Sequence, residues 1–107
     1  MTEIRVFYKN GVVEAISADG HSEFADKGND IVCAGVSTVF RMLAIAVVRV
    51  LERPELFEID ESSASMKVFL PAAVCRDAFL LIEAAVDMLR EFESQYPKNV
   101  RIVEVRS

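Results

Sequence analysis

The sequence predicts an α+β domain in which a mostly antiparallel sheet packs against two helices, in the order ββαββαβ. Five short runs are rich in β-branched and aromatic residues and are bounded by turn residues, as strands usually are. Two longer apolar runs, 31–51 and 72–94, repeat at helical spacing. With 107 residues, 52% of them apolar, the chain is long enough for one core. The mixture indicates helices layered on one sheet.

The chain opens with a predicted β-hairpin. Residues 3–9 alternate in polarity and are followed by Asn10-Gly11, the strongest short-range hairpin signal. Residues 12–18 form the return strand, which Asp19-Gly20 ends. The only histidine, His21, therefore follows directly after a strand, on a loop held by the sheet.

The first helix is predicted over residues 31–51, with Asp30 at or near its N-cap. The run is apolar on nearly every side, so we expect this helix to be central and buried. A sheet covers only one face of a helix in so small a domain. The second helix or a second subunit must cover the rest, which predicts a homodimer. Gly35 costs about 1 kcal/mol in a helix relative to Ala, so something is expected to pack closely there.

The second half repeats the alternation of strands and helix. Pro54 ends the first helix, and Pro71 opens the second. The elements expected here are strand 56–59, a polar turn at 60–63, strand 66–70, helix 72–94 and, after Pro97, strand 100–105.

Composition narrows the classes of function. The net charge of −5 argues against a general nucleic-acid binder, which needs a basic face. Two cysteines 42 positions apart fit neither a disulfide framework nor a C-x-x-C metal motif. No signal peptide is apparent, and Arg41 and Arg49 interrupt the long apolar run, which argues against a membrane span. We therefore expect a cytoplasmic protein without nucleic-acid or membrane partners.

His21 and Cys33 are the residues most suited to chemistry. A thiol about one turn inside a helix feels the positive end of its dipole, which favours the thiolate, and unpaired backbone N–H groups there suit an oxyanion. A thiolate with a nearby histidine can act as a nucleophile on acyl groups. The alternative is a cysteine that packs as a small hydrophobe and a surface histidine. One His and one Cys form a weak pattern, which by itself favours packing.

Other candidates have two interpretations each. Asp30 either orients the histidine or only caps the helix, and Ser37 either hydrogen-bonds within the site or back-bonds to the Cys33 carbonyl. Cys75 is interpreted as packing, because no histidine remains to serve it. A zinc site at His21 and Cys33 is disfavoured, since the chain has only three Cys and His residues and structural zinc prefers four such ligands. No cofactor is expected.

The motif around these residues resembles a known family. Gly20-His21, followed by Gly28-x-Asp30-Ile31-Val32-Cys33-Ala34-x-Val36-Ser37, is similar to the signature of the ribosomal-processing cysteine proteases, the Prp family. The order of elements matches as well, so the resemblance covers residues 1–107 as one domain.

The resemblance implies a homodimeric endopeptidase. Members of the family remove a short N-terminal extension from the large-subunit ribosomal protein L-twenty-seven. Cys33 would be the nucleophile and His21 its base, with Gly20, Asp30 and Ser37 in supporting positions. Two residues depart from the common pattern, since Ser22 and Gly35 stand where alanines are usual.

The loop between the histidine and the cysteine completes the predicted site. We expect residues 22–29 to be the mobile part that admits substrate, with Ser22, Glu23, Phe24 and Gly28 in contact with it.

Two other classes of function remain open. One is a non-catalytic dimeric module that binds a ribosomal or assembly protein by β-augmentation. The other is a redox thiol, which is disfavoured because no resolving cysteine lies near Cys33.

Overall fold

The structure is a computed structural model that describes residues 1–20 and 27–107, with side chains described outside 27–30. Five strands and three α-helices are present in this part of the chain. In order they are β1 Thr2–Lys9, β2 Val12–Asp19, α1 Lys27–Ala44, the π-helical segment η1 Ile45–Val50, the 3₁₀ turn η2 Pro54–Leu56, β3 Phe57–Asp60, β4 Ser65–Phe69, α2 Ala72–Asp77, α3 Phe79–Gln95 and β5 Val100–Arg106.

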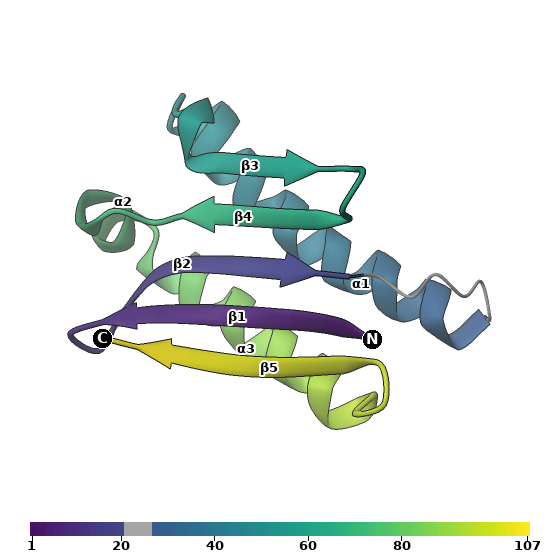
Figure 1. The fold of residues 1–107 in the computed structure, drawn as a ribbon. Coiled ribbons are helices and arrows are strands. Elements are labelled where there is room, and N and C mark those ends of the chain that lie inside the picture. The colour runs from purple at the N-terminus through teal and green to yellow at the C-terminus, as the bar shows by residue number, and fades with distance from the viewer. Residues whose placement is uncertain (21–26) are drawn as a thin grey trace.

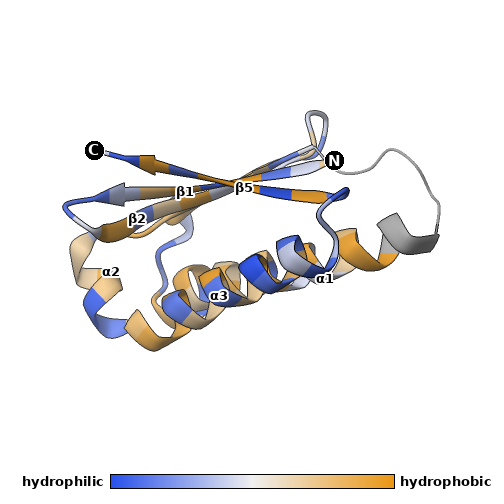
Figure 2. Cartoon of the chain, turned by 90° about the horizontal axis from the view of Figure 1, so that it is seen from below, coloured by the Kyte–Doolittle hydropathy of each residue, from blue (hydrophilic) through white to orange (hydrophobic). Residues whose placement is uncertain are grey.

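The strands form one sheet in the order β3-β4-β2-β1-β5. Only β1 and β5 pair in parallel, and the other three pairs are antiparallel, so the expected α+β class and the mostly antiparallel sheet are confirmed. The predicted hairpin turn is present, with positive φ angles at Asn10 (52°) and Gly11 (78°), as a type I′ turn requires. The two long helices cover one face of the sheet, and no helix of the described residues lies on the other face (Figures 1 and 2).

The core lies between the sheet and one stripe of each long helix. From α1 and η1 the stripe consists of Val32, Val36, Phe40, Leu43 and Val47, and from α3 of Ile82, Ala85, Val86 and Leu89. They pack against sheet residues such as Ile4, Val6, Ile16 and Val68, all of which are fully buried. This is the arrangement that helical spacing over an alternating sheet predicts.

The first helix is buried on one face only in the single chain. Its outward side exposes four large apolar residues, Ile31, Met42, Ile45 and Val50, by 63%, 53%, 43% and 73%. The sheet and α3 therefore leave part of the helix uncovered. A second subunit was expected to cover such a surface.

One segment, Ile31–Val50, is long and apolar enough to cross a membrane by length and composition, with a mean hydropathy of 2.2. The core helix of a water-soluble domain satisfies the same criterion. In this fold one side of the segment packs into the core beneath the sheet.

The start of α1 differs from the prediction. The helix begins at Lys27, so Asp30 lies in its first turn and not at the N-cap, and residues 27–29 are helical, not part of the loop. This first turn lies beyond the end of the sheet (Figure 1). No strand faces this first turn, so its residues do not need to be apolar. The apolar pattern of the sequence therefore shows where the helix begins to pack against the sheet, and not where the helix itself begins.

The ends of both helical runs also differ from the prediction. The first run widens into the π-helical η1, where the Leu51 amide donates to the carbonyl of Ala46. The second run is not one helix, because it breaks at Ala78 (φ −118°, ψ 24°) into α2 and α3. No glycine or proline marks this break, so the sequence carried no signal for it.

The expected close packing at Gly35 is present. A methyl group built on Gly35 would overlap the ring of Phe92, which belongs to α3. The missing side chain at Gly35 thus provides the space in which the Phe92 ring packs between the two helices.

Candidate functional site

Cys33 is half-buried on α1 and lines a cavity of about 280 Å³. The cavity lies between this helix, the strand ends at Thr2, Ala18 and Gly20, and the β3–β4 hairpin. Its remaining lining residues are Val36 and Ser37 from α1 and Ile59, Asp60, Glu61, Ala64, Ser65 and Met66 from the hairpin. Most of these side chains are small or apolar, so the cavity suits the backbone and apolar side chains of a peptide.

Helical spacing explains how α1 presents this wall. Cys33, Val36 and Ser37 are related by i, i+3 and i+4 and therefore lie on one side of the helix. The core stripe that begins at Val32 is buried against the sheet and fixes the rotation of the helix. The nucleophile candidate is thus placed by rigid packing.

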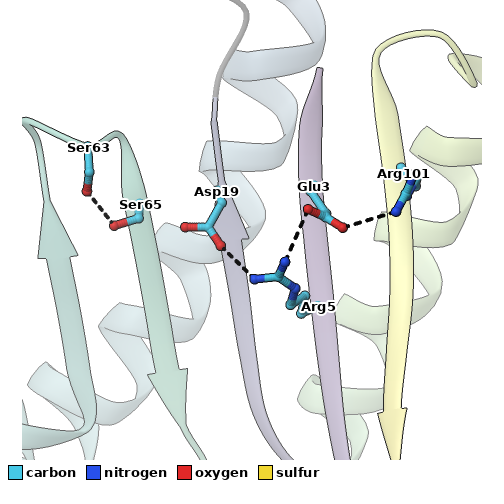
Figure 3. Close-up of polar contacts among 6 residues, drawn as sticks. All are labelled: Glu3, Arg5, Asp19, Ser63, Ser65 and Arg101. Atoms are coloured by element: carbon cyan, nitrogen blue, oxygen red, sulfur yellow. Dashed lines mark hydrogen bonds and ion pairs between the residues drawn. The ribbon is translucent and has the colours of Figure 1, made fainter.

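The end of β2, directly before His21, is anchored from both sides. Gly20 has a φ of +71°, and a Cβ there would lie 3.1 Å from the Met1 carbonyl oxygen, so both its conformation and its surroundings favour glycine. On the open face of the sheet, Arg5 donates to Asp19 and to Glu3 at 3.4 Å (Figure 3). Arg101 of β5 contacts Glu3 in turn, which links three strands at this end.

The hairpin wall is held by its own turn. Asp60 Oδ1 accepts hydrogen bonds from the Ser62 amide (3.0 Å), the Ser62 hydroxyl (2.6 Å) and the Ser63 amide (3.4 Å). Hydrogen bonds from Ser62 and then Ser63 lower the pKa of Asp60. The hydroxyls of Ser63 and Ser65 also meet at 2.9 Å across the turn (Figure 3).

A second cavity of about 540 Å³ adjoins the first. Ser37, Ile59 and Met66 line both cavities. The other lining residues of the second cavity are Arg41, Ala44, Ile45, Val48, Arg49 and Phe57. The two cavities therefore follow the same side of α1 along the hairpin.

The structure brings three predicted site residues together, namely Cys33, Gly20 and Ser37, around one cavity. His21, Ser22, Glu23 and Phe24 lie outside the described residues. Gly28 and Asp30 lie in the first turn of α1, and their side chains are likewise outside the description.

Ser37 does not back-bond to the Cys33 carbonyl. Its hydroxyl has no hydrogen-bond partner in the described part of the chain, whereas the neighbouring Thr38 donates to the Ala34 carbonyl at 2.7 Å. The hydroxyl of Ser37 therefore remains available to a ligand in the cavity that it lines.

Sequence reasoning missed Thr2 and the hairpin residues of the cavity. Thr2 is buried at the first position of β1, and Glu61 lies in a turn interpreted only as polar. Their approach to Cys33 follows from sheet topology and not from local pattern, so no sequence signal pointed to them.

The early start of α1 changes the electrostatics expected at Cys33. Cys33 is the seventh residue of the helix, and from the fifth residue onward a helical amide bonds within the helix. The helix dipole acts mainly within the first turn. The position of Cys33 in the helix therefore does not favour the expected oxyanion site of free amides.

Cys75 packs as expected. It is buried, and its thiol donates to the carbonyls of Val13 (3.0 Å) and Leu70 (3.2 Å). Desolvation by burial raises the pKa of this thiol. Cys75 therefore contributes to the packing of the helix against the sheet.

The described side chains also show no metal centre. No group of three His, Cys, Asp or Glu residues lies close enough to hold a metal ion within residues 1–20 and 31–107.

A cysteine on the wall of an open, largely apolar cavity has the access to a bound substrate that a thiol nucleophile needs. The family described as Cysteine protease Prp matches residues 1–101. The chain belongs to this family and is a cysteine-type endopeptidase.

Two curated relatives carry the name Ribosomal processing cysteine protease Prp. The Bacillus subtilis protein is 30% identical over 103 residues, which cover 92% of this chain and 91% of the relative. The Staphylococcus aureus protein is 28% identical over 93 residues, covering 86% and 87%.

Solved structures share the fold. SMU.848 from Streptococcus mutans superposes with a TM-score of 0.83 at 24% identity, covering 100% of this chain and 96% of that one. The S. aureus protease Prp in complex with a substrate peptide gives 0.79 at 23% identity, covering 97% and 99%.

Proposed function

We propose that this endopeptidase removes a short N-terminal extension from the large-subunit ribosomal protein L-twenty-seven, with Cys33 as nucleophile and His21 as its base. The observation that carries the proposal is the position of Cys33 on the wall of the cavity between α1 and the hairpin. Membership of the family and the names of the curated relatives support the processing role.

The chemistry follows from a thiol and an imidazole. His21 takes the proton of the Cys33 thiol, and the thiolate attacks the carbonyl carbon of the scissile bond. The tetrahedral intermediate collapses to a thioester as His21 gives the proton to the leaving amine. Water then hydrolyses the thioester and restores the thiol. Ser37, whose hydroxyl lines the same cavity, is placed to hydrogen-bond to the substrate.

The substrate is expected to bind in an extended conformation. Among the described residues, β3 is an edge strand that pairs with β4 alone, so its outer backbone groups are placed to pair with another strand. Phe57 and Ile59 of β3 line the adjoining cavities and offer apolar surface to alternate side chains of such a peptide.

The test uses a peptide that spans the extension and its junction with the mature protein. Cys33→Ala is expected to abolish cleavage, and Cys75→Ala, which changes the thiol away from the cavity, is expected to retain it. Normal cleavage by Cys33→Ala would refute the proposal. Binding without cleavage by the unmodified protein would favour the β-augmentation module instead.

The role of His21 has a separate readout. Alkylation of Cys33 measured against pH should be fast well below pH 8 and should slow in His21→Ala. Equal rates in the two proteins would exclude His21 as the base.

We also propose that the protein works as a cytoplasmic homodimer without nucleic-acid or membrane partners. The apolar residues on the outward side of α1 support a partner subunit, and the net charge of −5 opposes nucleic-acid binding. A ribosomal protein as substrate places the reaction where ribosomes are assembled.

A further inference from the structure

The two cavities beside α1 form one groove, here called the hairpin groove. It consists of the lining of the Cys33 cavity and of the adjoining second cavity, with Ser37, Ile59 and Met66 common to both. Ile59 and Met66 face each other in the register of β3 and β4. The groove therefore has a continuous and largely apolar floor that begins at Cys33.

One end of the hairpin groove is acidic. Among the residues whose side chains the structure describes, the charged ones that line the Cys33 cavity are Asp60 and Glu61. Three hydrogen bonds from the turn hold Asp60 Oδ1 and stabilise its charged form. Glu61 is exposed, and its carboxylate has no hydrogen-bond or ion-pair partner in the described part of the chain.

The other end of the hairpin groove is basic. The charged residues of the second cavity are Arg41 and Arg49, which are both exposed. Neither arginine forms an ion pair with a described residue. The arginines that do are Arg5, Arg53, Arg90, Arg101 and Arg106. Within the described side chains, charges of opposite sign thus lie at the two ends of one apolar groove.

We propose that the hairpin groove binds its peptide in a fixed polarity, with a lysine or arginine at the Asp60–Glu61 end beside the scissile bond and an acidic side chain at the Arg41–Arg49 end. The proposal rests on the proposed peptidase function and adds the charge pattern of its substrate. Complementary charges at the rim of a binding site contribute orientation and association rate more than affinity.

The spacing of the two preferences follows from the helix. Arg41 lies eight residues after Cys33, which is about 12 Å along α1. An extended peptide covers this distance in about four residues. The preference for an acidic side chain should therefore lie about three to five residues from the scissile bond, on the side opposite the basic residue.

The experiment scans one lysine and, separately, one glutamate along an otherwise apolar peptide that the enzyme cleaves. Lysine near the scissile bond should raise kcat/KM about two- to fivefold over glutamate, the size expected for an exposed ion pair. Glu61→Gln should weaken this preference, because Asp60 still carries one negative charge, and Glu61→Lys, which leaves no net charge beside Asp60, should abolish it. Glu91→Lys, an equal change of charge on the exposed side of α3, should leave the preference unchanged.

The basic end is tested in the same way. Arg41→Glu, which leaves no net charge beside Arg49, should abolish the preference for glutamate at the distant position, and Arg76→Glu on α2 is the matched control. Both effects should shrink at 1 M salt, because screening removes exposed charge interactions.

Several outcomes would overturn the proposal. They are equal rates for lysine and glutamate at every position, control variants as effective as the groove variants, and loss of a dimer in Arg41→Glu by light scattering, which would make the groove an interface. If the enzyme cleaves no peptide of the set, the proposed function itself fails. Binding of the same peptides to Cys33→Ala, followed by fluorescence anisotropy, still measures the charge pattern in that case.

Discussion

The two cysteines occupy opposite environments. Cys33 is half-buried beside an open cavity, whereas the Cys75 thiol is buried and donates to two carbonyls of the sheet layer. A buried thiol packs as a small hydrophobe, and its reactivity is suppressed. The structure thus places one cysteine at a cavity and the other in the core.

Cys75 gives the stability of the protein a pH dependence with a definite sign. Burial raises the pKa of its thiol in the folded state, so the folded protein holds this proton more tightly than the unfolded chain. Above about pH 8.5, where thiols of unfolded chains ionise, the free energy of unfolding should fall, by at most about 1.4 kcal/mol per pH unit. Urea unfolding between pH 7 and 10 measures this effect.

The matched variant isolates the contribution of Cys75. Cys75→Ala should lose about 1–2 kcal/mol at pH 7, from packing and two weak hydrogen bonds, and its fall at high pH should be smaller. Cys33→Ala should keep the full fall. Identical pH profiles for Cys75→Ala and the unmodified protein would contradict the assignment.

Site residues could be predicted from the sequence where their placement depends on neighbouring residues in the chain. The glycine before His21 and the helical register of Cys33 and Ser37 are local, and the structure places Cys33, Gly20 and Ser37 at one cavity. Glu61 is brought to the same cavity by strand pairing, which no local pattern reveals.

At the scale of elements, Gly35 and Phe92 set how closely α1 and α3 approach. Gly35→Ala gains about 1 kcal/mol of helix propensity but forces the Phe92 ring to move, and overpacking costs about 1–3 kcal/mol. We expect a net loss of stability. The site should respond too, because Cys33 lies two residues from Gly35 on the same helix.

A double-mutant cycle tests this contact. Phe92→Leu should make room for the methyl group, so that Gly35→Ala is better tolerated in that background, with a coupling of about 1 kcal/mol. Thermal unfolding and cleavage rates of the four proteins give the coupling directly. Additive effects would show that the two side chains do not compete for space.

The elements themselves were predictable where side chains pack in a regular period. All five strands and both helical runs appear close to their expected places, and the long helices and the strands β1 and β2 do so because each buries a repeating apolar face. The early start of α1 and the break at Ala78 were not predicted. The first turn of α1 has no sheet opposite it, and the break carries no glycine or proline.

At the scale of the whole molecule, the outward side of α1 predicts association. Ile31 and Met42 are 11 positions apart, about three helical turns, and both are exposed by more than half. If this side forms the dimer interface, Met42→Glu should yield a monomer in light scattering at micromolar concentration. Leu80→Glu, at an exposed apolar residue of α3, serves as the control. A monomeric unmodified protein would refute the dimer.

The topology was predictable only in part. The order of elements and the antiparallel hairpins follow from local turns, and Asn10-Gly11 pairs β1 with β2 as expected. The parallel pairing of β5 with β1 joins residues about 100 positions apart. This pairing depends on where the chain lies after the end of α3. The predicted order of strands and helices does not determine that position.

The edge position of β3 has a consequence for motion. This four-residue strand pairs with β4 alone, and three of its residues are exposed, yet it forms a wall of the cavity at Cys33. Short edge elements open locally at lower free energy than core strands. Native-state hydrogen exchange should therefore release the amides of β3 well before those of β1 and β2, and equal protection would contradict this. β3 can then move when a peptide binds, while the part of the domain around β1 and β2 keeps its structure.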